Sequence, residues 1–147
     1  MGSPPLLFLS YVALKYTAYA GWCFLGIRWL RGITPVLSSV LGLGLVRLFL
    51  GIFFGVAIFL IGAMMHLNVP NHPWLSYLAV YVPVRWVEWS IMTLLVAPGS
   101  GIFVLNGNSK ANLWKWGGIA VSHLADMPLI LSGSGVTDML PVGRFLC

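Results

Sequence analysis

The sequence predicts an all-α fold, an integral membrane bundle of four transmembrane helices with both termini on the non-cytoplasmic side. Of its 147 residues, 59% are hydrophobic and only 7% are charged, whereas about a quarter of the residues in a soluble domain are charged. The apolar residues form four long stretches without strict alternation, which is typical of membrane helices and not of barrel strands. Arg28, Arg31, Lys110 and Lys115 lie near the ends of these stretches.

The four helices are expected to form a single transmembrane domain that occupies the whole chain. Their expected ranges are about 6–27, 35–65, 75–97 and 113–131. The second is long for a span of about 20 residues, so we expect it to tilt or to end beyond the hydrocarbon. The link at 66–74 holds two prolines and no full charge, and the link at 98–112 is rich in glycine, asparagine and serine, which indicates a loop.

The positive charges predict the orientation of the helices. Arg28 and Arg31 follow the first helix, and Lys110 and Lys115 lie around the start of the fourth. Short loops rich in lysine and arginine stay on the cytoplasmic side, so both termini should lie on the other side, with Arg144 as a weak exception. We expect a multi-pass protein of a bacterial inner membrane or an organelle membrane. The net charge of +5 forms no basic cluster, so no nucleic-acid partner is expected.

Ionisable side chains interrupt the predicted helices. They are Lys15, Arg47, Arg85, Glu88, His123 and Asp126. A charged group at the centre of a bilayer costs roughly 2.5–3.5 kcal/mol on insertion scales, so these residues must be paired, hydrated or turned toward the interior of the bundle. We expect them to form one intramembrane polar cluster, which Lys15 either joins or leaves by extending toward the interface.

The depths of the charged residues predict their pairing. Arg47 and Glu88 lie at similar distances from the inner ends of their helices, and so do Arg85 and Asp126, at about 1.5 Å of rise per residue. We therefore expect Arg47 to pair with Glu88 and Arg85 to pair with Asp126. His123 precedes Asp126 by three residues, which places both on one helix face.

Glycines line one side of the second predicted helix. They are Gly44, Gly51, Gly55 and Gly62. The spacing of Gly51 and Gly55 matches the small-xxx-small pattern that lets two helix backbones approach closely. Arg47 precedes Gly51 by four residues and therefore lies on the same side. The pattern predicts close packing beside the buried charge.

The histidines do not predict a haem bound by this chain alone, and the sequence identifies no other cofactor. His123 lies near the middle of its helix whereas His66 lies at the outer edge, so the two differ in depth and should not ligate one haem together. A haem or pigment shared with another subunit through His123 or His66 stays open. We expect no metal site, because the link around His66 and His72 lacks carboxylates and thiolates. No catalytic residues are assigned, since no nucleophile motif is present.

Three classes of function fit these observations. The first is an accessory or structural subunit of a larger membrane complex, and we favour it because nothing in the chain completes a catalytic or selectivity motif. The second is a homo-oligomeric ion or proton channel or a transporter. The third is an intramembrane enzyme acting on a lipidic or quinone-like substrate. The expected partners are the lipid bilayer and either other membrane subunits or further copies of the chain.

Overall fold

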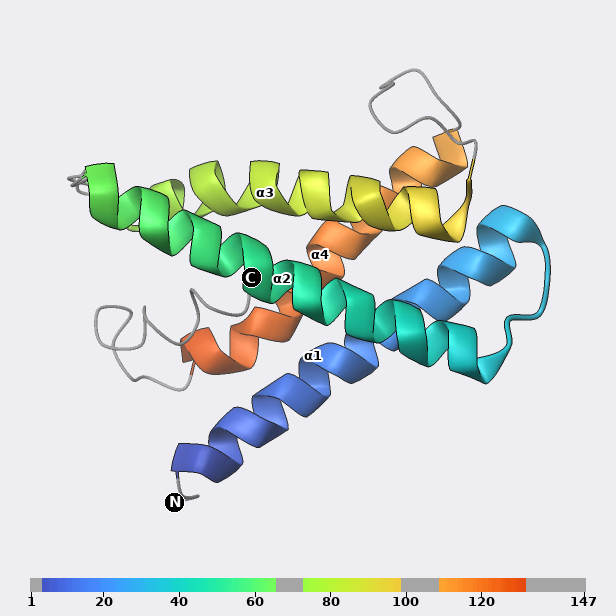
Figure 1. Ribbon diagram of the computed structural model, residues 1–147, viewed down its shortest axis with the longest axis horizontal. Helices are drawn as coiled ribbons and strands as arrows, with labels where there is room; N and C mark the ends of the chain where they lie inside the picture. Colours follow the sequence, from blue (N-terminus) through green and yellow to red (C-terminus); the bar gives the residue numbers. More distant parts are fainter. Residues whose placement is uncertain (1–3, 66–72, 99–108, 132–147) are drawn as a thin grey trace.

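The chain folds into four long helices in the part that the structure describes. The structure is a computed structural model that describes residues 4–65, 73–98 and 109–131. These residues form α-helices and no strand, which confirms the all-α prediction. The helices are α1 (Pro4–Gly26), α2 (Leu37–Met65), α3 (Pro73–Val96) and α4 (Ser109–Leu131), with a short π-helical segment, η1 (Ile27–Arg31), after α1 (Figure 1).

The first helix extends further than the sequence predicted. Arg28 and Arg31 were expected in the link, but both lie in η1, which continues the helix. Gly32 ends it in the left-handed conformation with a φ of 68°, and its amide donates a hydrogen bond of 3.1 Å to the carbonyl of Arg28. A glycine at this position ends a helix without the steric cost that a Cβ would add.

The starts of the last two helices also lie earlier than predicted. Pro73 begins α3, and a proline suits the first turn because its missing amide hydrogen would have no partner there. Ser109 begins α4, and serine is favoured at helix starts because its hydroxyl can accept a bond from a free amide. Lys110 therefore lies on a helix and not in the link. The short segment expected at the interface, 101–105, lies outside the described residues.

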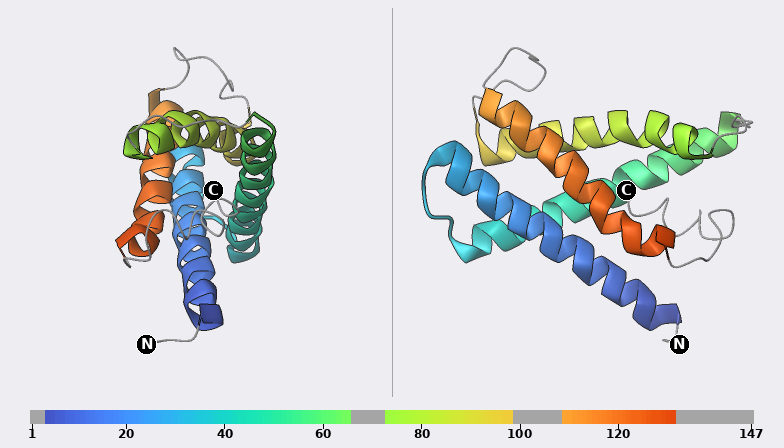
Figure 2. Two further views of the ribbon diagram at one scale, coloured as in Figure 1. Left: turned by 90° about the vertical axis from the view of Figure 1, so that its left-hand side faces the viewer. Right: turned by 180° about the vertical axis from the view of Figure 1, so that it is seen from behind.

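The helices cross instead of running parallel. α1 packs against α2 and α4, and α3 packs against α4 and α2. The segment η1, the start of α2, the end of α3 and the start of α4 gather at one end of the molecule, on the right in Figure 1 (Figures 1 and 2). Toward the other end, the end of α2 and the start of α3 come together, away from the start of α1. The arginines of η1 and the lysines at the start of α4 therefore lie at the same end.

Close packing of α1 on α2 depends on a glycine. A Cβ added at Gly44 would lie 3.1 Å from the Cβ of Ala20 and 3.2 Å from the ring of Tyr16, which is tighter than ordinary contact. Gly51 and Gly55 are buried on the same helix. The packing around Gly62, near the end of α2, lies outside the described residues.

The polarity of the molecule is inverted relative to a soluble protein. Large apolar side chains are exposed, with Phe49 at 65% and Phe53 at 68% of their full exposure, while Lys15, Arg47 and Glu88 are almost completely buried. Within the described ranges, the 22-residue stretch Leu37–Ile58 of α2 is the one helix that is long and apolar enough to cross a bilayer by length and composition.

Candidate functional site

The interior of the bundle holds a completely buried ion pair between two helices. Arg47 of α2 and Glu88 of α3 approach to 2.5 Å between Nη2 and Oε2, and neither side chain is exposed. Glu88 is the partner predicted for Arg47 from the similar distances of the two residues from the inner ends of their helices. Burying a charge is costly unless an opposite charge offsets the lost hydration, so each of these two residues requires the other.

A second carboxylate joins three helices. Asp126 of α4 forms ion pairs with Lys15 of α1, at 2.8 Å, and with Arg85 of α3. The hydroxyl of Tyr11 donates a further hydrogen bond of 2.6 Å to Asp126. Arg85 thus has the partner expected for it, and Lys15 joins the buried charges instead of extending toward the surface.

Aromatic rings enclose the buried cations. The guanidinium of Arg47 lies 4.7 Å from the ring centroid of Tyr19 and 5.1 Å from that of Trp89. The ammonium of Lys15 lies 5.0 Å from the ring centroid of Tyr11. Cations at these distances are attracted by the negative ring faces, and the attraction is stronger where water is excluded. The rings therefore supply part of the stabilisation that water would give to these charges.

Polar and packing contacts from α4 hold Trp89 beside Arg47. The indole Nε1 of Trp89 donates a hydrogen bond of 3.0 Å to the hydroxyl of Ser122, and Arg47 Nη2 lies 3.5 Å from the same oxygen. Gly118, one turn before Ser122, lies directly under the ring, where an added Cβ would collide with it. Trp89 also makes an edge contact with Trp114, with ring centroids 5.2 Å apart.

Of the two histidines considered as cofactor ligands, His123 and His66, the structure describes only His123. His123 lies on α4, three residues before Asp126, and is half-buried. His66 lies outside the described residues, so its relation to His123 stays a prediction. No three histidine, cysteine or acidic side chains gather into a potential metal site within the described ranges.

The charges that form ion pairs inside the bundle do not balance. Lys15, Arg47 and Arg85 carry three positive charges, whereas Glu88 and Asp126 carry two negative charges. The five residues come from all four helices. The network therefore connects the whole bundle and retains an excess of one positive charge when every member is ionised.

Two tyrosines in this network were missed by the sequence analysis. Tyr11 and Tyr19 lie four residues before and four residues after Lys15. On a helix this spacing places all three on one face, and the structure buries all three there. The periodicity around the lysine was the signal that could have identified them.

Comparison of the chain with known protein families, with curated proteins and with solved structures finds no match.

Proposed function

We propose that this chain is a multi-pass integral membrane protein that serves as a small structural subunit of a larger membrane complex. In this proposal all four helices cross the bilayer and both termini lie on the non-cytoplasmic side. The membrane is a bacterial inner membrane or an organelle membrane. The inverted polarity of the molecule, with paired charges inside and large apolar side chains outside, is the observation that carries the proposal.

The buried pairs account for helices that are less apolar than α2. Charged side chains lower the apolar character of α1, α3 and α4, but Lys15, Glu88 and Asp126 point into the bundle, where each has an opposite charge. In lipid, a charge that pairs inside the protein does not face hydrocarbon. The exposed leucines of all three segments, among them Leu14, Leu95 and Leu124, then contact acyl chains, which is favourable in a bilayer and unfavourable in water.

Both buried carboxylates already have cationic partners within the chain, which favours a structural role. Glu88 and Asp126 are both engaged by cations at hydrogen-bond distance, and together the pairs tie all four helices into one arrangement. The outer side of α2 presents an apolar stripe that includes Leu45, Phe49 and Phe53. Such a stripe suits either lipid or the helices of a neighbouring subunit.

The mass of the gently solubilised protein tests this function. The chain alone has a mass of 16.1 kDa. A structural subunit should co-purify with different proteins in a particle several times heavier, and the composition of that particle would identify its partners. A particle that contains only this chain, whether as a monomer or as a closed ring, would contradict the proposal.

The excess positive charge and several buried polar atoms without a hydrogen-bond partner favour a channel or transporter as a second candidate. Arg47 Nε and Nη1 and Glu88 Oε1 are buried without a hydrogen-bond partner among the described residues. They leave polar capacity inside the bundle that a passing ion or water could use. This reading requires a pathway through one chain or between several copies.

Ion flux into vesicles distinguishes this second candidate from the first. The purified chain should conduct ions or protons when reconstituted, and Glu88→Gln and Asp126→Asn should change the rate or the selectivity. A Leu45→Ala variant, altered on the outer side of α2, serves as the control. A parent protein without flux would remove this candidate and leave the structural role unaffected.

A further inference from the structure

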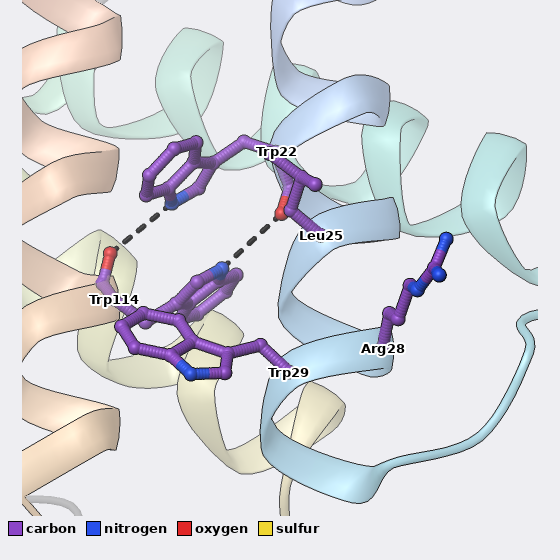
Figure 3. A pocket seen from close by; sticks show the side chains of 5 residues that line it. All are labelled: Trp22, Leu25, Arg28, Trp29 and Trp114. Atoms are coloured by element: carbon purple, nitrogen blue, oxygen red, sulfur yellow. Dashed lines mark hydrogen bonds between the residues drawn. The ribbon is translucent and has the colours of Figure 1, made fainter.

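A cavity at the surface lies where α1, η1 and α4 meet. It has a volume of about 430 Å³ and is lined by Trp22, Leu25, Arg28, Trp29 and Trp114 (Figure 3). It lies at the end of the molecule that carries the arginines of η1 and the lysines of α4. The buried ion pairs take no part in its lining, so it is separate from the charge network.

Two tryptophans from different helices form a fixed wall of this cavity. Trp22 Nε1 donates a hydrogen bond of 3.1 Å to the carbonyl of Trp114, and Trp114 Nε1 donates one of 3.2 Å to the carbonyl of Trp22 (Figure 3). Glycines make room for both rings: a Cβ at Gly26 would lie 2.5 Å from the indole of Trp114, and one at Gly117 would collide with Trp22. Both indole N–H groups are occupied, so these two residues offer a ligand only their ring surfaces.

Arg28 supplies the charge beside this apolar surface. Its side chain is exposed, and within the described part of the chain it makes neither an ion pair nor a hydrogen bond. It follows Leu25 by three residues, and in Figure 3 its guanidinium extends away from the indole rings. The lining of the cavity is therefore apolar, and the charge of Arg28 lies beyond its edge. A ligand that fills the cavity and extends past this edge to Arg28 combines an apolar part with an anionic group.

We propose that this cavity binds an anionic phospholipid, with an acyl chain against Trp22, Leu25 and Trp29 and the phosphate at Arg28. The proposal rests on the membrane location proposed above. Tryptophan is favoured at the level of the lipid headgroups, and clustered lysine and arginine attract the anionic lipids of the cytoplasmic leaflet. A free phosphate ion would use Arg28 alone and would leave the apolar surface without a function.

Lipid retention measured by native mass spectrometry tests the proposal. The full chain in a zwitterionic detergent is offered an equal mixture of phosphatidylglycerol and phosphatidylcholine, and the parent protein should retain the anionic lipid about fivefold better, as expected for one arginine at a membrane surface. Arg28→Gln should abolish this preference. Lys110→Gln removes one positive charge at the same end without altering the cavity, and it should keep the preference.

A second measurement locates the acyl chain. Phosphatidylglycerol with brominated acyl chains should quench tryptophan fluorescence more in the parent protein than in Trp29→Ala. Equal retention of the two lipids, or equal loss of preference in Arg28→Gln and Lys110→Gln, would overturn the proposal, and so would displacement of the lipid by inorganic phosphate alone. These results would leave membrane insertion intact, whereas a protein that washes off membranes at high pH would defeat the proposed membrane location itself.

Discussion

Arg47 of α2 and Glu88 of α3 form an ion pair at 2.5 Å in which neither side chain is exposed. The relationship is informative because such a pair is costly to form and still more costly to break. Asp126 likewise forms ion pairs inside the bundle, with Lys15 and with Arg85.

Removing one member of the first pair should destabilise the bundle more than removing both. Glu88→Gln leaves the buried charge of Arg47 without its carboxylate, and we expect a loss of about 3–5 kcal/mol in the free energy of unfolding. The double variant Arg47→Leu with Glu88→Leu leaves no buried charge at the position. It should recover most of that loss in thermal unfolding in detergent. A double variant less stable than Glu88→Gln would show that the pair has another role.

Asp126 forms ion pairs with two cations, so substitutions of Asp126 and of Lys15 should lower the stability of the bundle by unequal amounts. Lys15→Met leaves Asp126 paired one to one with Arg85, so we expect a small change in stability. Asp126→Asn removes the carboxylate that forms ion pairs with both Lys15 and Arg85, so its loss should exceed that of Lys15→Met by about 2 kcal/mol or more. Thermal unfolding of both variants measures the difference. Equal losses would indicate that Lys15 is not a surplus cation.

The glycine under Trp89 should not tolerate a side chain. A Cβ at Gly118 would collide with the indole, so Gly118→Ala should shift Trp89 and cost about 1–3 kcal/mol in stability. Gly42, on α2, has nothing within 4 Å of an added Cβ. Gly42→Ala is therefore the matched control, and it should be neutral or stabilising by up to about 1 kcal/mol. Equal effects of the two variants would contradict the packing of Trp89 on α4.

The orientation can be measured with thiol labelling of intact cells. Cys23 is completely buried, so Cys147 should be the thiol that reacts, from outside, with a maleimide that does not cross membranes. In a Cys147→Ser background, Lys110→Cys should react only after the membrane is permeabilised, because the proposed orientation places the positive end on the cytoplasmic side. Labelling of Lys110→Cys in intact cells would reverse the proposed orientation.

The sequence predicted the helices and the pairing of the charges better than their surroundings. Depth along a helix follows from a constant rise, so counting residues was enough to match Arg47 with Glu88. It could not decide whether Lys15 faces inward, because that depends on how α1 rotates against α4. The crossing of the helices and the cavity beside Trp22 arise from side-chain packing between segments far apart in the sequence, and no local pattern encodes them.

Two departures have local physical causes. Arg28 and Arg31 were placed in a link because positive charges commonly flank spans, yet the helix continues until Gly32 supplies a left-handed cap. No role was predicted for Ser122 from the sequence. Its role is to accept the indole N–H of Trp89, a contact between α3 and α4 that spacing along one helix cannot reveal.

Extraction of native membranes with alkaline carbonate tests the central claim most directly, because high pH releases peripheral proteins and leaves spanning proteins in the bilayer. If the exposed apolar side chains face lipid and the charges pair inside, the protein stays in the membrane pellet and requires detergent for release. Recovery of the folded chain in the carbonate supernatant would contradict the account.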